Sequence, residues 1–398
     1  MQPSSTNEAK PRNTSIDFIR GVALLGILVI NMQAFAMVSA TYANPMAAGQ
    51  STFDVVLWCI QHVLADQKFM GIFSMLFGVG LAIFTDNVER RGGSPLYRFY
   101  RRLFWLALFG CVHAYLVWHG DILVTYAICG LFVFWLRRLS PRKLFAAAVG
   151  TLVLGACVTL TLQILLPFMS AIESAELAQE WRPDANWIAY ETGVFRSGWW
   201  EQMELRVLFA LGFQMEFFVL FTFWRASGLM LLGMGLYRAG FFDSEGRGPR
   251  YLQVAAAGIV SGLVLSGSGL VYNFAREWSM EASMLAGGLF NYCGGIAMSV
   301  GYMALLMLVP AGFVLRAPIE AVGRTAFSNY ILQSVLATWI FYGHGLGLFG
   351  LLSRAEQWFV IVGIWTVQIG LTLLWLRFYK MGPLEWLWRK LTYGWRAD

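Results

Sequence analysis

Residues 17–38 read DFIRGVALLGILVINMQAFAMV, an apolar run broken by only a few polar side chains. A helix of about 20 residues is long enough to cross the hydrocarbon core of a bilayer. Runs of this kind recur along nearly all of the 398 residues, of which 58% are hydrophobic and only 13% are charged. So few charged side chains cannot cover a water-facing surface. The sequence therefore predicts an all-α, polytopic membrane helix bundle.

About ten of these runs are expected to cross the membrane, with both termini in the cytoplasm. They lie at roughly 17–38, 69–85, 103–119, 122–138, 144–169, 207–240, 251–273, 289–315, 324–342 and 357–378. The run at 207–240 could be two short spans broken at Trp224-Arg225, or one tilted span. One span is favoured, because it leaves most of the 29 Lys and Arg residues in cytoplasmic loops, as the positive-inside rule requires.

The organisation is one membrane bundle with flanking segments. Residues 1–16 are expected to be a cytoplasmic tail before an uncleaved signal anchor, and 17–378 the transmembrane bundle. An acidic, Trp-rich outer segment at 170–205 is interpreted as a lid over an outward-facing site or as an amphipathic connection in the headgroups. Residues 379–398 are expected to form a cytoplasmic amphipathic helix, in which Pro383 suits the first turn and Glu385 can pair with Arg389.

Several cofactor classes and partner classes are disfavoured by composition. The five cysteines are scattered without paired spacing, which argues against a disulfide framework or a thiolate metal site. Of the four histidines only His113 is well inside a span, and no H-E-x-x-H sequence is present, so neither a metal nor a haem is expected. The net charge of +6 reflects topology, and no nucleic-acid partner is expected.

Polar groups in the first span are candidates for function, because ionisable groups inside a membrane are costly. Arg20 and Asn31 are eleven residues apart, which places them within about 20° of the same helix face and about 16 Å apart in depth. An inner cation and an outer amide on one face suggest a polar channel. The alternative is that Asp17 pairs with Arg20 at the inner interface while Asn31 bonds a neighbouring helix.

A second group of polar residues is gathered near the outer leaflet by the expected topology. His113 lies near the outer end of the third span, and Asp121 opens the fourth; Asn31 and Lys68 lie at comparable depth. A histidine beside a carboxylate is a plausible general base, because its unperturbed pKa is near 6.5. A hydrogen-bonded helix contact is the alternative for His113.

The later spans add further polar side chains. Asn329 and Gln333 fall on one face at i, i+4, with Arg324 at the inner end of that span, and the sixth span is expected to bury Glu216. These residues could line the same cavity, or they could form interhelical hydrogen bonds.

Taken together, seven stretches resemble the YeiB-like family of bacterial multi-pass inner-membrane proteins, a domain-of-unknown-function family. The resemblance covers essentially the full chain, and the combination of motifs is specific. The stretches are DFIRGVALLGIL at 17–28 with Asn31, Lys68-Phe69, FSMLFGVG at 73–80, Arg101-Arg102-Leu103, GDIL at 120–123, GRTAFSNY at 323–330 and GPLEWLWR at 382–389.

The resemblance implies a relation to the transmembrane acyltransferase superfamily, whose bundles of about ten helices move an acyl group from a cytoplasmic donor to an outer acceptor. In acyltransferase family 3 the first span carries an Arg and, eleven residues later, a His thought to be catalytic. Arg20 matches that Arg, but the His position is occupied by Asn31. Asn cannot act as a general base near neutral pH, so His113 becomes the candidate base.

The expected function is therefore that of a membrane-embedded acyltransferase. Asp121 would orient His113, which would deprotonate an acceptor hydroxyl or amine, while Asn31 and Lys68 would position the acyl carbonyl or stabilise its oxyanion. No permanently bound cofactor is expected, and acyl-CoA is the expected donor substrate.

The expected substrate-binding residues complete this hypothesis. Arg20 and Arg324 would attract the anionic donor, and Asn329 and Gln333 would line the same path. The expected partners are membrane lipids and a small-molecule or envelope-glycan acceptor, with a homodimer left open, in the bacterial inner (cytoplasmic) membrane. The alternative function is a transporter or flippase for a small molecule or lipid-linked substrate, which would use the same polar cavity without chemistry.

Overall fold

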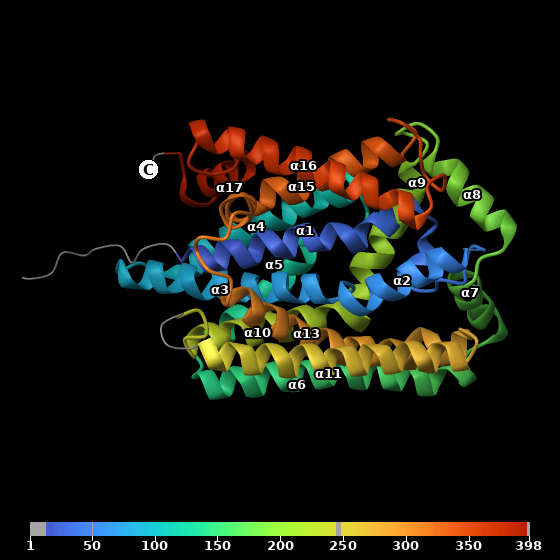
Figure 1. The fold of residues 1–398 in the computed structure, drawn as a ribbon, viewed down its shortest axis with the longest axis horizontal. Helices are drawn as coiled ribbons and strands as arrows, with labels where there is room; N and C mark the ends of the chain where they lie inside the picture. The colour runs from blue at the N-terminus through green and yellow to red at the C-terminus, as the bar shows by residue number, and fades with distance from the viewer. Residues whose placement is uncertain (1–12, 50, 244–247, 396–398) are drawn as a thin grey trace, which may run out of the picture.

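The computed structural model describes residues 13–49, 51–243 and 248–395, and every element in these ranges is a helix. The long helices run roughly parallel or antiparallel in one bundle (Figure 1). They are α1 (Thr14–Ala36), α3 (Lys68–Arg90), α4 (Pro95–Val112), α5 (Leu123–Leu136), α6 (Pro141–Leu165), α10 (Phe223–Arg238), α11 (Gly248–Ala275), α13 (Gly288–Met307), α15 (Ala326–Phe341) and α16 (Arg354–Phe378).

Shorter helices connect or flank the long ones. They are η1 (Ser39–Tyr42), α2 (Thr52–Leu64), η2 (His113–Val117), η3 (Leu166–Phe168), α7 (Ala171–Trp181), α8 (Ala185–Phe195), α9 (Met203–Gly212), η4 (Phe213–Thr222), α12 (Met280–Ala282), η5 (Ser283–Gly287), α14 (Arg316–Arg324) and α17 (Pro383–Tyr393).

Each run expected from the sequence to cross the membrane overlaps a helix. Within the described residues, seven helical segments are long and apolar enough to span a bilayer. They are Thr14–Ala36, Thr52–Arg90, Pro141–Phe168, Met203–Arg238, Gly248–Ala275, Met280–Met307 and Arg354–Phe378. The other expected runs lie on α4, α5 and α15, which have 18, 14 and 16 residues. The prediction of an all-helical membrane bundle is confirmed.

The long run that begins near residue 207 is one continuous helical segment of 36 residues, Met203–Arg238. Its middle part, η4, is π-helical, and Trp224 and Arg225 lie within the first turn of α10 rather than at a break. The run is therefore one continuous helical segment, without the expected alternative of a break at Trp224-Arg225. Glu216, expected to be buried, is instead exposed on η4.

Helix α1 forms the centre of the bundle. Ile19, Ala23, Leu24 and Leu28 are fully enclosed, and α1 contacts α3, α14, α15 and α16. Small residues permit the closest approach, because the backbones of α1 and α14 touch where Gly323 meets the carbonyl of Asp17. Without a hydrophobic force between helices in lipid, such close van der Waals contact is a main source of association.

The two ends of the bundle differ in charge. The start of α1 and helix α17 lie at the same end, whereas α2, α7, α8 and α9 lie at the opposite end (Figure 1). We call the first the basic end; it carries Arg90, Arg102, Arg138, Arg238 and Arg389. We call the second the acidic end; it carries Glu173, Glu176, Glu180, Glu191 and Glu201.

The helix near the C-terminus lies where the sequence predicts one, but its acid has a different partner. Glu385 does not form an ion pair with Arg389. It accepts hydrogen bonds from the backbone N–H groups of Phe327 (2.7 Å) and Ser328 (3.2 Å). These N–H groups are in the first turn of α15, where a carboxylate is favoured by the helix dipole. Glu385 therefore connects α17 to the first turn of α15 by hydrogen bonds at the basic end.

The close contact between α1 and α14 can be tested with a matched pair of glycines. In Gly323→Ala the new Cβ would collide with the Asp17 carbonyl, so the helices must separate, and we expect a loss of about 2 kcal/mol or more in stability. In the control Gly363→Ala, on α16, the Cβ meets open space, and we expect a gain of about 0.5–1 kcal/mol. Thermal unfolding of both purified variants in detergent measures the difference; equal melting temperatures would contradict the assignment.

Candidate functional site

A large cavity of about 1970 Å³ opens within the acidic half of the bundle. Most of its lining is apolar and comes from the end of α6, from α7 and from the α9–η4 segment. Its polar wall comes from the turn between α2 and α3, from α10 and from the region between α11 and α13. We call this space the outer cavity.

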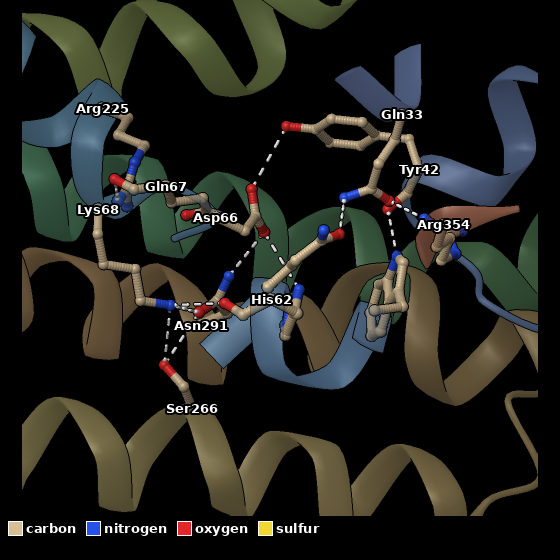
Figure 2. A network of polar contacts seen from close by, with 12 residues as sticks. Gln33, Tyr42, His62, Asp66, Gln67, Lys68, Arg225, Ser266, Asn291 and Arg354 are labelled. Carbon is tan, nitrogen blue, oxygen red and sulfur yellow. Dashed lines mark hydrogen bonds and ion pairs between the residues drawn. The ribbon is translucent and has the colours of Figure 1, made fainter. Parts of the chain in front are cut away.

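Lys68 lies at the centre of a network of polar contacts next to the polar wall (Figure 2). Its side chain is completely buried, and its amine donates to the carbonyl of His62 (2.9 Å), to Ser266 Oγ (3.3 Å) and to Asn291 Oδ1. Ser266 belongs to α11 and Asn291 to α13, so one ammonium joins the start of α3 to two helices distant in sequence. Lys68 therefore lies behind the lining of the outer cavity, to which its neighbours Asp66 and Gln67 belong, and contacts neither His113 nor Asp121.

A histidine–aspartate pair faces the cavity in front of Lys68. His62 Nδ1 is 3.2 Å from Asp66 Oδ2, which also accepts a hydrogen bond from Asn291 Nδ2 (2.8 Å). The hydroxyl of Tyr42 donates to the other oxygen of Asp66 (3.3 Å). Both His62 and Asp66 line the cavity. This pair was not predicted from the sequence, although only four residues separate His62, in the last turn of α2, from Asp66 in the turn that follows.

Arg225 completes the polar wall (Figure 2). It reaches from α10 and donates to the backbone carbonyls of Tyr292 (2.9 Å) and Gln67 (3.4 Å), with its guanidinium also 4.8 Å from the Tyr292 ring centroid. Gln67 has a left-handed backbone with φ of 65°, which is unfavourable for a residue other than glycine. A strained turn thus presents its carbonyl to a cation that lines the cavity.

A smaller cavity of about 230 Å³ lies at the basic end, and we call it the inner cavity. Arg20, Arg102 and Arg324 all line it, together with Glu385 and Trp388. The structure thus brings together the two arginines expected to bind an anionic donor, and adds Arg102, whose guanidinium lies 3.6 Å from the Trp388 ring centroid. The apolar remainder of the lining extends to two tyrosines deeper in the bundle.

Arg20 and Arg324 are also held by neighbouring groups. Arg20 forms an ion pair with Asp17 at 3.0 Å, which is the alternative predicted for the first span, and it approaches the carbonyl of Gly323 at 3.5 Å. Arg324 donates to the carbonyl of Lys380 at 2.5 Å. Pairing with Asp17 and lining the inner cavity are compatible for Arg20, because its side chain remains partly exposed.

His113 and Asp121 form a close buried pair. His113 Nδ1 is 2.8 Å from Asp121 Oδ1, and Asp121 Oδ2 accepts a hydrogen bond from the N–H of Val124 (2.9 Å). The carboxylate therefore orients the ring, and with a proton on Nδ1 the other nitrogen is an acceptor. That nitrogen, Nε2, is buried and has no hydrogen-bond partner among the described residues. This is the geometry of an oriented base.

The His113–Asp121 pair lies between the two cavities and lines neither. Tyr126 lines both cavities, and its hydroxyl is 2.8 Å from that of Ser74. Tyr330 closes the deep end of the inner cavity, and its ring centroid is 5.0 Å from that of His113. Trp118, on the outer cavity, lies on another side of the imidazole, with ring centroids 6.3 Å apart.

The remaining expected site residues separate into two groups. Asn31 lines the outer cavity. Asn329 and Gln333 line neither cavity: Asn329 Nδ2 donates to Thr372 Oγ1 (2.9 Å) on α16, and Gln333 Nε2 donates to Gln368 Oε1 (3.1 Å) and to a carbonyl of α1. For these two residues the structure favours interhelical hydrogen bonds over substrate contact.

Irregular helices concentrate around these sites. Three π-helical segments occur in the part of the chain that the structure describes: η2, η4 and η5. His113 is the first residue of η2, and residues of η4 and η5 line the outer cavity. Because π-helical turns are rare and occur frequently at functional sites, their positions support these regions as functional.

The segment 170–205 covers the outer cavity. Glu176 and Glu180 of α7, and Trp187 and Glu191 of α8, line it. Glu191 is 1% exposed and accepts hydrogen bonds from the N–H of Ser39 (2.8 Å) and from its hydroxyl (3.2 Å). Burial raises the pKa of Glu191 to about 7 despite these two donors.

The described residues offer no cluster of metal ligands. Between residues 13 and 395, apart from the gaps at 50 and 244–247, no three His, Cys, Asp or Glu side chains lie close enough together to hold a metal ion.

The raised pKa of Glu191 predicts a pH-dependent stability. Between about pH 4.5 and 7 the folded protein holds a proton that the unfolded chain has lost, so stability falls as pH rises through this window, by up to about 3 kcal/mol. In Glu191→Gln this fall should be absent. Melting temperatures from pH 4 to 8 measure it, with the exposed Glu201→Gln as control; identical slopes for wild type and Glu191→Gln would refute the prediction.

These observations define an all-helical membrane protein with a buried His–Asp pair between an inner, arginine-lined cavity and an outer cavity. Residues 236–395 match the family model described as "Protein of unknown function (DUF418)". The chain is 31% identical over 393 residues to the "Uncharacterized protein YeiB" of Escherichia coli (strain K12), with 96% of each chain covered. It therefore belongs to the YeiB-like family.

A second relative is also similar to this chain along nearly its whole length. The "Uncharacterized protein YxaH" of Bacillus subtilis (strain 168) is 29% identical over 415 residues, which cover 99% of this chain and 96% of the relative. No solved structure matches this chain.

Proposed function

We propose that the protein is a membrane-embedded acyltransferase that moves an acyl group from a cytoplasmic acyl-CoA-like donor to an acceptor in the outer cavity. The observation that carries the proposal is the position of the His113–Asp121 pair between two cavities of different character. A donor site and an acceptor site on opposite sides of one oriented base are what transfer across a membrane requires.

The inner cavity has the properties of a donor site. Its three arginines can form charge-assisted hydrogen bonds with phosphates, and Trp388 offers a flat ring beside them. A volume of about 230 Å³ is too small for a whole coenzyme, but it suits the narrow acyl-bearing arm. The anionic part of the donor would then remain at the arginines while the arm extends towards Tyr126 and Tyr330.

The chemistry assigned to the pair is general-base catalysis. His113 Nε2 takes the proton from an acceptor hydroxyl or amine, whose oxygen or nitrogen forms a bond to the thioester carbonyl carbon. The carbon–sulfur bond breaks, and the departing thiolate takes the proton back from His113 as the thiol. Because His113 lines neither cavity, the side chain of Tyr126 or Trp118 must rotate to admit the reactants. Asn31 lines the outer cavity and would bind the acceptor there. Lys68 is enclosed by its own hydrogen-bond partners and receives no role at the carbonyl.

For the orientation we propose ten spans, with the basic end and both termini in the cytoplasm, in the bacterial inner membrane. The support is the charge difference between the two ends, in the sense of the positive-inside rule, and the position of α17 at the same end as the start of α1 (Figure 1).

The orientation can be tested with reporters fused after residue 398. A fluorescent protein should be bright and alkaline phosphatase inactive, because the former folds in the cytoplasm and the latter requires the periplasm. Fusions in the 170–205 segment should give the opposite pattern. An active phosphatase at the C-terminus would contradict the proposed orientation.

Acyl transfer can be tested by CoA release from acetyl-CoA in the presence of an envelope lipid extract. His113→Asn should lower kcat by about 100-fold or more with little change in the KM for acetyl-CoA, because it removes only the base. Arg324→Gln should mainly raise that KM. The control is His344→Asn, which changes a histidine outside both cavities.

Two outcomes would overturn the enzyme assignment. Full activity in His113→Asn would remove the proposed base. Substrate flux in proteoliposomes without any CoA binding or release would instead support the transporter or flippase alternative.

A further inference from the structure

We infer that the outer cavity binds one membrane phospholipid, with its tails on the apolar lining and a zwitterionic headgroup, a phosphate with an ammonium, against the polar wall. The inference deepens the proposed function and rests on it in one respect: this lipid would carry the acceptor group. Lipid binding itself is independent of any chemistry at His113.

The apolar side of the cavity opens towards the bilayer. Leu165 at the end of α6, Ile172 of α7 and Met215 of η4 all line the cavity, yet they are 50%, 72% and 63% exposed. Side chains that face both the cavity and the outer surface mark a lateral opening between these elements. Leu165 and Met215 belong to segments apolar enough to span the membrane, so this opening faces lipid.

The polar wall carries a cation, Arg225, that forms no direct ion pair within the described residues, although the Asp66 carboxylate lies in the same wall. The hydrogen bonds of Arg225 within the described residues use two of its N–H groups, and both go to neutral backbone carbonyls. A guanidinium with free donors, facing an apolar cavity, is complementary to a phosphate, which it can bind through two parallel hydrogen bonds.

Other polar atoms of the wall are buried without a partner. Gln67 Oε1, Asn273 Oδ1, Ser283 Oγ and Trp278 Nε1 have no hydrogen bond among the described residues, and all four residues line the cavity. Asn273, Ser283 and Trp278 are at most 5% exposed. Each unsatisfied polar atom costs about 1–3 kcal/mol, which a headgroup with both donors and acceptors would recover.

The acids of the cavity favour an ammonium over a purely anionic headgroup. Glu176 and Glu180 of α7 and Glu216 of η4 line the cavity and are exposed near its opening. Asp66 and Glu191 also line the cavity, but His62, Asn291 and Ser39 already contact them. The three exposed carboxylates near the opening, with Arg225 in the polar wall, match a headgroup that carries both charges, such as phosphoethanolamine.

The first experiment is a lipid titration of the purified protein in detergent, followed by native mass spectrometry. The probes are phosphatidylethanolamine, phosphatidylglycerol and diacylglycerol with identical chains. The wild type should bind phosphatidylethanolamine most tightly and diacylglycerol least. Arg225→Gln should weaken both phospholipids by about 10-fold or more, because a charged hydrogen bond is lost. The control Arg276→Gln removes an exposed cation at the same end that does not line the cavity.

A double variant tests the contribution of the exposed carboxylates near the cavity opening. Glu180→Gln combined with Glu216→Gln should weaken phosphatidylethanolamine and leave phosphatidylglycerol unchanged or tighter. Equal affinity of the wild type for all three probes, or tighter binding of phosphatidylglycerol than of phosphatidylethanolamine, would overturn the headgroup assignment.

Plugging variants keep the test valid if Arg225→Gln does not fold. Gly212 and Gly288 line the outer cavity, and a Cβ at either position meets no atom within 4 Å. Gly212→Trp and Gly288→Trp should therefore fold and lose phospholipid binding. Gly363→Trp, equally open but outside both cavities, should bind normally. Unchanged binding in both plugged variants would refute the site.

The two proposals fail in different ways. His113→Asn should keep normal phosphatidylethanolamine binding while losing CoA release. If the wild type binds none of the three lipids but still releases CoA with the envelope extract, the lipid site is wrong and the acyltransferase proposal stands. If it binds phosphatidylethanolamine but never releases CoA, the acyltransferase proposal is wrong and the lipid site stands.

Discussion

The ammonium of Lys68 is enclosed among α3, α11 and α13. The polar wall of the outer cavity depends on the hydrogen bonds that this ammonium donates. A charge buried in a bilayer-spanning bundle costs several kcal/mol unless polar groups surround it. Here the carbonyl of His62, Ser266 Oγ and Asn291 Oδ1 surround it, and Asn291 in turn donates to Asp66. One buried cation thereby sets the position of the α2–α3 turn, whose residues form the polar wall.

A second constraint divides the molecule into two halves of different charge, each with its own cavity. The basic end gathers three arginines around a small cavity, and the acidic end covers a large apolar one. The His113–Asp121 pair lies where the two cavities approach each other at Tyr126. An ionisable pair at this depth is costly, and its hydrogen bonds and the irregular η2 helix hold it in one orientation.

Part of the candidate site was predictable from sequence, because local spacing is enough to place it. The pairing of His113 with Asp121 follows from a short connection between neighbouring helices, and the pairing of Asp17 with Arg20 follows from the i, i+3 spacing. The convergence of Arg20 with Arg324 follows because both lie at the same end of the bundle. The partners of Lys68 were not predictable, because Ser266 and Asn291 lie about 200 or more residues further along the chain.

By itself the sequence determined that the chain is an all-helical membrane protein, where its apolar helices lie, and which end of the bundle is basic. Apolar length and charge distribution are local properties, and a bilayer acts on them one segment at a time. Only the tertiary structure decided that Asn329 and Gln333 bond neighbouring helices, that Glu385 caps α15, and that His62, Asp66 and Arg225 face one cavity. Periodicity specifies which face of a helix is polar, but the packing of small residues specifies which helix that face meets.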